Sequence, residues 1–372
     1  MKSTLTPLTT LLQDVVRDLH DLTVFNPRTV DELEAALAVI VTVLCAHLLG
    51  ERNIGWAAFS AYMVMRAHAS STVRRGVLRV AGTIVGAALA CAIPSQSASS
   101  PVCIAIALLA VSTFTLYLAL TEQNGYAWLF AGITFCMVLT AALEDKTTNL
   151  TLFAMNRVVE VLTGTVCCIV ISSLSTTFIR RTLSGAYWTP PLQEVAASAR
   201  RWHFGAFLHA LKGGIALALI PLISHLIQVP SPVQAGTTVL AVTMVPMSQL
   251  ASAGGPTRSR MMHRFIGCLS GGSIATIALL LCHSSVLALA LVLVGGVIVG
   301  RHIENSTTGA NYIGTQFALA FLVVLVPDHY LTIDVGPGVE RFLGVLCGIS
   351  ILYPVLVLGR PLHSLSNAQF FR

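Results

Sequence analysis

Long apolar stretches recur along this chain, and only a few polar residues at a time interrupt them. Of its 372 residues, 55% are hydrophobic and 10% are charged, whereas a soluble protein of this length carries about 25% charged residues. The missing charge means that much of the surface faces lipid instead of water. We therefore expect an all-α fold, a polytopic transmembrane helical bundle in contact with the lipid bilayer.

Twelve apolar segments can be placed, six in each half of the chain. They cover residues 33–49, 54–66, 77–93, 101–120, 126–143 and 158–178, and then 204–228, 233–250, 262–283, 285–300, 310–327 and 339–359. A helix needs about 20 residues to cross a bilayer, so we expect about 10–12 transmembrane helices. The segments 54–66 and 285–300 are the most marginal, and we expect them to be short, tilted or partly re-entrant.

The basic residues are distributed unevenly between the loops. Lysine and arginine favour the cytoplasmic side of short loops. If the N-terminus lies inside and all twelve segments span, 18 of the 22 Lys and Arg residues fall inside, and the four outside are Arg52, Lys146, Arg157 and Arg341. Both termini are therefore expected in the cytoplasm. The net charge of +6 is a signal of topology, and nucleic acid is not an expected partner.

One pattern, Arg-x-x-(Gly or Glu)-x-x-x-Gly, occurs four times. The copies are Arg79-Gly82-Gly86, Arg157-Glu160-Gly164, Arg264-Gly267-Gly271 and Arg341-Gly344-Gly348. The sequence numbers of corresponding arginines in the two halves differ by 185 and by 184, and this near-constant spacing indicates a duplicated unit. The small residues of each copy lie on one helix face, where they let two helix backbones approach closely in lipid.

The repeat extends upstream at an offset of 178 in the numbering, which relates His47 to His225 and Trp56 to Gln234. Six segments per half is an even number, so the two repeats are expected to be parallel and related by an axis along the membrane normal. The expected organisation is an amphipathic cytoplasmic segment at 1–30, membrane repeats at 31–179 and 204–360, a cytoplasmic linker at 180–203 and a cytoplasmic tail at 361–372.

The four motif arginines have two interpretations. In the first, each arginine extends to the lipid phosphates and anchors its helix. In the second, the four arginines, two near each membrane face, attract anions into and out of a central path. The second interpretation makes Arg79, Arg157, Arg264 and Arg341 candidate substrate-binding residues.

Several motifs resemble a known family. Gly55-Trp56, Arg74-Arg75-Gly76 and the run from Arg79 to Gly86 are similar to the fusaric acid resistance / aromatic acid exporter family, over residues 30–360. The resemblance implies an inner-membrane efflux carrier for aromatic carboxylic acids and related toxic compounds, often with a periplasmic adaptor protein. Larger members carry a sizeable cytoplasmic domain after the first membrane half, where this chain has only the linker.

Three ionisable residues are candidates for proton coupling. Glu160 replaces a motif glycine inside a segment, at position i+3 from Arg157, so either a transport role or a structural ion pair fits its position. His47 and His225 are equivalent by the repeat, near the outer ends of their helices. Histidine changes charge near neutral pH, although a hydrogen-bonded core or interface histidine is the alternative for both.

Aromatic and amide side chains complete the candidate site. Trp56, Trp128 and Tyr312 are candidates for stacking on an aromatic substrate or for anchoring at the membrane interface, and Trp128 aligns with Tyr312 at the offset of 184. Gln316 is a candidate to hydrogen-bond a carboxylate or to tie helices together.

No catalytic motif, nucleotide-binding loop or Cys/His metal spacing occurs, so neither an enzyme nor a cofactor is expected. The leading hypothesis is an ion-driven secondary exporter of small organic anions. The alternative is an organic-anion channel of the same fold without proton coupling, and a third is a membrane subunit without flux of its own. The sequence leaves a homo-oligomer open.

Overall fold

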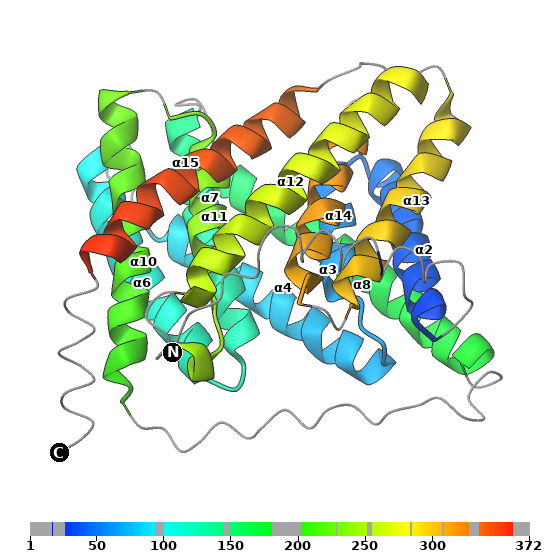
Figure 1. Cartoon of the computed structure of the whole chain (residues 1–372), viewed down its shortest axis with the longest axis horizontal. Coiled ribbons are helices and arrows are strands. Elements are labelled where there is room, and N and C mark those ends of the chain that lie inside the picture. Colours follow the sequence, from blue (N-terminus) through cyan, green and yellow to red (C-terminus); the bar gives the residue numbers. More distant parts are fainter. Residues whose placement is uncertain are drawn as a thin grey trace. The chain divides into compact units, whose positions relative to one another are not determined.

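The chain is described here by a computed structural model (Figure 1). The described residues are 17, 27–93, 100–144, 149–180, 202–227, 229–250, 255–282, 285–306, 309–326 and 335–359. Most of the amphipathic segment predicted at 1–30, most of the linker and the whole C-terminal tail lie outside them. Within the described ranges the chain is helical and contains no strand, which confirms the all-α class.

Twelve α-helices form in the described ranges. They are α2 (Pro27–Leu48), α3 (Ile54–Val64), α4 (Ala69–Cys91), α6 (Pro101–Thr121), α7 (Gly125–Glu144), α8 (Leu150–Ser175), α10 (Phe204–Leu226), α11 (Pro232–Thr243), α12 (Gly255–Cys282), α13 (Val286–Glu304), α14 (Asn311–Leu325) and α15 (Gly336–Leu358). Serine side chains cap two of them at equivalent places, Ser100 before α6 and Ser285 before α13.

Among the described helices, seven are long and apolar enough to cross a membrane, namely α6, α7, α8, α10, α12, α13 and α15. The marginal segment 54–66 forms α3, whose 11 residues extend only about 16 Å, half of the hydrocarbon core. The other marginal segment lengthens to the 19 residues of α13, because its helix continues to Glu304. Two segments expected to be longer, α11 and α14, have 12 and 15 residues.

The chain folds into two compact units, and each unit combines helices from both repeats. Unit 1 contains α2 and α3 of the first repeat with α13 and α14 of the second. Unit 2 contains α6 and α7 of the first repeat with α10 and α11 of the second. The long helices α4, α8, α12 and α15, which carry the arginine motifs, contribute residues to both units.

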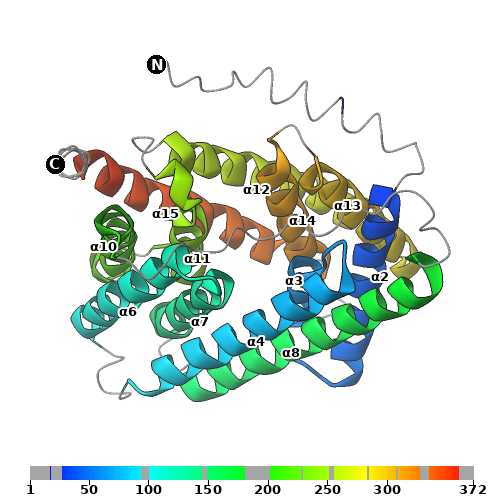
Figure 2. The ribbon, with the colours of Figure 1, turned by 90° about the horizontal axis from the view of Figure 1, so that it is seen from below.

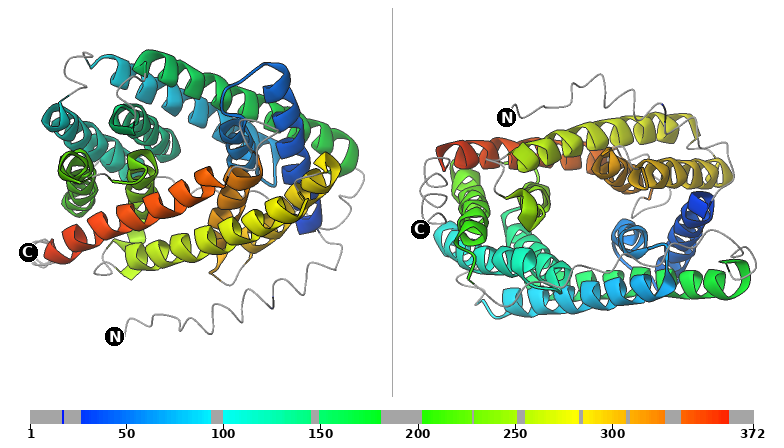
Figure 3. Two further views of the ribbon diagram at one scale, coloured as in Figure 1. Left: turned by 90° about the horizontal axis from the view of Figure 1, so that it is seen from above. Right: turned by 60° about the horizontal axis from the view of Figure 1, so that its bottom comes forward.

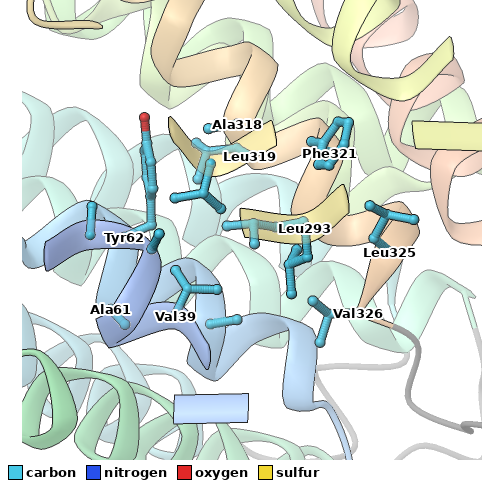
Figure 4. Close-up of a cluster of buried hydrophobic side chains, with 14 of the residues drawn as sticks. Val39, Ala61, Tyr62, Leu293, Ala318, Leu319, Phe321, Leu325 and Val326 are labelled. Atoms are coloured by element: carbon cyan, nitrogen blue, oxygen red, sulfur yellow. The ribbon is translucent and has the colours of Figure 1, made fainter. Parts of the chain in front are cut away.

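Unit 1 has its own apolar core. Most of its residues come from α2, α3, α13 and α14, which lie together in the ribbon (Figure 3). Figure 4 shows part of it, where Val39 of α2, Tyr62 of α3, Leu293 of α13 and Phe321 of α14 meet. The first turns of α4 lie along α8 in this unit (Figure 2), and the hydroxyls of Ser172 and Thr72 are 3.3 Å apart.

Unit 2 has a second apolar core. Most of its residues come from α6, α7, α10 and α11, which lie together in the ribbon (Figure 2). Its largest fully buried side chains include Phe135, Leu139, Leu217 and Leu240. Gly132 of α7 lies directly against Thr115 of α6, which shows how closely these backbones approach.

The motif glycines make equivalent helix contacts in the two repeats. A Cβ added at Gly86 of α4 would lie 3.0 Å from the carbonyl carbon of Ala131 on α7, and one at Gly271 of α12 would lie 2.9 Å from that of Phe317 on α14. Both distances are too short for a side chain, so only glycine allows these helices to touch. Gly82 and Gly267 contact Ala127 and Ile313 one turn earlier.

The second pair of motifs repeats a different contact. Gly164 of α8 packs on Ala57 and Ser60 of α3, and Gly348 of α15 packs on Ala235 and Thr238 of α11. The partner residues differ by the offset of 178 read from the sequence. Gly344 also packs on α11, through Gln234. All seven motif glycines therefore lie against a neighbouring helix.

Candidate functional site

Arg264 is held inside unit 1 by a neutral amide. It lies in the third turn of α12 and is buried, and its Nη1 donates a hydrogen bond of 2.8 Å to Oε1 of Gln316 on α14. The thiol of Cys268, one turn further along α12, lies 3.8 Å from the same amide oxygen. The predicted residues Arg264 and Gln316 thus belong to one site.

Arg341, in the second turn of α15, belongs to the same site. Its guanidinium is buried and lies 5.8 Å from the centre of the Phe59 ring of α3. Arg264 and Tyr312 are close enough to Arg341 to act on it electrostatically. Arg264 and Arg341, which the sequence predicts near opposite membrane faces, thus both belong to unit 1 and lie within electrostatic reach of each other.

Unit 2 contains the equivalent arginines of the first repeat. Arg79 of α4 is buried over the Phe130 ring of α7, 4.1 Å from its centre, and its Nη1 lies 3.5 Å from the hydroxyl of Tyr126. Arg157 of α8 is also buried and lies 5.2 Å from the centre of the Phe153 ring. Each unit therefore contains one pair of motif arginines among aromatic side chains.

The contacts also define which aromatic residues correspond. Gly271 packs on Phe317 as Gly86 packs on Ala131, so α14 and α7 correspond at an offset of 186 in the numbering. That register relates Tyr126 to Tyr312, in place of the predicted pairing of Trp128 with Tyr312. Trp128 instead lies edge-on to Phe114, with ring centres 5.9 Å apart.

Trp56 lies beside the unit 1 site. Its ring centre is 5.3 Å from that of Phe59, the residue over which Arg341 lies. The structure thus brings five predicted binding residues together in unit 1, namely Trp56, Arg264, Tyr312, Gln316 and Arg341. Two guanidinium groups with an amide and aromatic rings can hold a carboxylate at one end and an aromatic ring at the other. We call this group, with Phe59, the arginine site.

Glu160 lies at the N-terminal end of the short helix α3. It is buried in α8, and its Oε1 accepts a hydrogen bond of 3.0 Å from the amide of Asn53, the residue that precedes α3. A second carboxylate, that of Glu51, accepts a hydrogen bond from Thr163 of α8 nearby. Negative groups are favourable at this end of a helix because the backbone N–H groups point toward them.

Arginine side chains donate hydrogen bonds to the backbone carbonyls at the C-terminal end of α3. The carbonyl of Met65 accepts hydrogen bonds from Arg301 at 2.9 Å and from Arg66 at 2.6 Å, and that of Met63 accepts one from Arg75 at 3.0 Å. The last carbonyls of a helix have no partner within it, so a short helix that ends inside a membrane protein needs such donors.

The backbone groups at both ends of the short helix α11 in unit 2 also have side-chain partners. The carboxylate of Glu144 accepts a hydrogen bond of 3.0 Å from the backbone N–H of Val233, in the first turn of α11. At the other end, Nε2 of His209 lies 2.8 Å from the carbonyl of Thr243. Both units are therefore built around a buried half-length helix with an acid at its start and a base at its end.

The two predicted histidines occupy equivalent places. His47 lies in the last turn of α2 and His225 in the last turn of α10, and neither side chain is buried. His225 belongs to unit 2, and His47 lies at the opposite end of α2 from the ionic residues described next.

Sequence reasoning missed an ionic cluster in unit 1. Arg301 of α13 donates two hydrogen bonds to Asp31 of α2, at 2.7 and 3.2 Å. Arg180, after α8, binds both carboxylate oxygens of Glu34. His302 completes the cluster with a contact to Glu32.

The signal for this cluster was present in the sequence. Arg180 and Arg301 lie at predicted cytoplasmic ends of apolar segments, where basic residues indicate topology. Three acids at the start of the first segment, Asp31, Glu32 and Glu34, had no assigned partner. Buried carboxylates need a partner, and counting both signs of charge would have pointed to this end of the bundle.

A family model described as fusaric acid resistance protein-like matches residues 37–171 and 215–355. The two matched regions lie in the two halves of the chain and together cover more than half of it. They confirm the family resemblance and the internal repeat. No curated protein and no solved structure matches the chain.

Proposed function

Since this multi-pass membrane protein belongs to the fusaric acid resistance protein-like family, a family of membrane transporters, we propose that it exports small organic anions, most of all aromatic carboxylates, across the inner membrane. Transport is driven by an ion gradient. The observation that carries this proposal is the closeness of Arg264 and Arg341 inside unit 1.

Two buried guanidinium groups within electrostatic reach of each other repel, and a bound anion relieves that repulsion. Arginine suits this role because its planar fork matches a carboxylate with two parallel hydrogen bonds. Gln316 orients the guanidinium of Arg264 through its amide oxygen. The carboxylate of the substrate thus binds between Arg264 and Arg341.

The aromatic part of the substrate packs against rings of the same site. Phe59 and Trp56 present adjacent faces from α3, and Phe59 lies against Arg341. Ring stacking and burial of apolar surface favour an aromatic acid over an aliphatic one. The pair Arg79 and Arg157, with Tyr126 and Phe130, forms the equivalent site for the anion in unit 2.

Proton coupling through Glu160 remains part of the proposal, with His47 and His225 as further candidates. Glu160 is buried at the start of α3, the helix that carries Phe59 and Trp56. Protonation of a carboxylate at that place removes a favourable interaction with the helix N-terminus. An alanine at Glu160 that leaves gradient-driven flux intact excludes this role. A periplasmic adaptor is a further proposed partner.

The test uses the purified chain in liposomes with labelled benzoate, a pH gradient and a membrane potential clamped at zero. A proton–anion antiporter accumulates benzoate on the acidic side. Passive partition of the weak acid fills the alkaline side, so the direction distinguishes the two. Acetate, which lacks a ring, is the control substrate, and protein-free liposomes are the blank.

The variants Arg264→Gln and Arg341→Gln are expected to lose saturable benzoate flux, because each removes one guanidinium from the site. Unchanged flux in both variants contradicts the assignment of the site. Flux that only follows the electrochemical gradient of benzoate, with measurable current, favours the channel over the carrier. No flux of any kind contradicts transport by this chain alone.

A further inference from the structure

One end of unit 1 contains an ionic cluster that the proposed anion site does not use. Two ion pairs of this cluster keep their charges. Arg301 binds both oxygens of Asp31, and Arg180 binds both oxygens of Glu34. Arginine stays protonated at every accessible pH, so these pairs keep their charges and hold α2 to α13 and to the end of α8.

A third pair in the cluster can change its charge. Nδ1 of His302 lies 2.7 Å from Oε1 of Glu32, and both side chains are buried. The charged neighbours of the pair are Arg28 and Asp31 on α2 and Arg301 on α13. Asp31 and Arg301 neutralise each other, and Arg28 is only half-buried. The charge of the pair therefore depends on whether the imidazole holds one proton or two.

The remaining acid at this end of unit 1 is Glu304, which has partners other than histidine. Glu304 accepts a hydrogen bond of 2.7 Å from the hydroxyl of Tyr62, and its carboxylate lies 3.3 Å from Arg301 and 3.8 Å from Arg66. Glu32 is thus the only acid among the described members of this cluster whose hydrogen-bonding partner is a histidine instead of a guanidinium or a hydroxyl.

The equivalent helices of unit 2 pack without this cluster. The offset of 178 relates Asp31, Glu32 and Glu34 to His209, Ala210 and Lys212 of α10. The capping serines relate α13 to α6 at an offset of 185, which places Leu116 and Tyr117 at the positions of Arg301 and His302. Helices α10 and α6 still pack together, and there Gly213 contacts Leu116. This helix pair therefore packs in unit 2 without an ionic cluster of that kind.

From this difference we infer that Glu32 and His302 form a further proton-binding site, in addition to the candidates named above, and that anion export against a gradient requires it. This inference rests on the function proposed above. With Nδ1 of His302 donating to the Glu32 carboxylate, a second proton on the imidazole produces an imidazolium that the carboxylate neutralises. Loss of that proton returns the pair to its single negative charge. No other bond forms or breaks.

Unit 1 also supplies a physical connection from this pair to the anion. Arg301, the neighbour of His302, donates to the carbonyl of Met65 at the end of α3. Phe59 of α3 lies under Arg341 in the arginine site. A change of charge at His302 alters the field at Arg301 and thus the end of the helix that lines the anion site.

The experiment measures two activities of the reconstituted full chain. One is benzoate exchange at equal pH on both sides, which needs the anion site but no proton. The other is accumulation driven by a pH gradient of one unit at zero membrane potential, which for one proton per anion reaches about tenfold. The variants are Glu32→Gln and His302→Gln, which keep a hydrogen-bonding side chain at each place. Glu122→Gln, at the exposed end of α6, is the matched control.

We expect both variants to retain exchange and to lose accumulation, while the control keeps both activities. Accumulation that persists in either variant overturns the inference and leaves the proposed function intact. Absence of exchange in the wild-type protein overturns the proposed function and the inference together. If one variant does not purify as a folded protein, the other decides. Proton movement recorded with an internal pH dye must stop together with accumulation.

Discussion

The motif glycines allow a sharp test, because two adjacent glycines of α12 differ only in what they face. Gly271 lies against the backbone of Phe317 on α14, and Gly272 has nothing within 4 Å of where its Cβ would be. We expect Gly271→Ala to destabilise the protein and Gly272→Ala to stabilise it.

The expected change in stability of each variant follows from the geometry. A Cβ at Gly271 would lie 2.9 Å from the carbonyl carbon of Phe317 and closer to its oxygen, whereas carbon atoms in contact lie about 3.5–4.0 Å apart. The two backbones must separate, and overpacking of this kind costs about 1–3 kcal/mol. At Gly272 the alanine only removes the conformational freedom of glycine, which is worth about 0.5–1 kcal/mol in a helix.

The assay is thermal unfolding of the purified variants in detergent, followed by the loss of monodisperse protein. For units of roughly 150–250 residues, 1 kcal/mol corresponds to about 2–4 °C, so the two variants should differ by several degrees with opposite signs relative to the wild type. Gly296, which faces the Phe321 ring, and Gly295, which faces open space, give a second matched pair in α13. Equal midpoints in both pairs would refute the assignment of these contacts.

Three further outcomes test individual contacts. Asp31→Asn leaves Arg301 buried with a weakened partner and should cost about 3–5 kcal/mol, seen as early thermal unfolding; a midpoint within error of the wild type contradicts the buried pair. Glu144→Gln removes a charge from the start of α11 and should cost about 1 kcal/mol, whereas no loss would show that the carboxylate does not cap that helix. Gln316→Leu removes the acceptor of Arg264 and should weaken benzoate exchange, and full exchange would exclude the amide from the site.

The class of the protein and its duplication follow from local sequence features. Hydropathy and scarce charge are properties of short windows, and lipid permits helices in such windows. The interval between Arg79 and Arg264 reports the repeat directly, and Gly86 and Gly271 mark helix faces because only a small residue permits a close crossing in lipid. The family motif around Trp56 rests on the same local pattern.

Only the tertiary structure decided which helices combine and which charges meet. Asp31 and Arg301 are far apart in the sequence, and neither residue's surroundings there indicate the other. The sequence predicts Arg264 and Arg341 near opposite membrane faces, whereas the fold puts both in unit 1, where they act on each other electrostatically. Apolar helices offer similar surfaces to one another, so hydropathy does not select partners. Packing of small residues and pairing of buried charges over long separations made that choice.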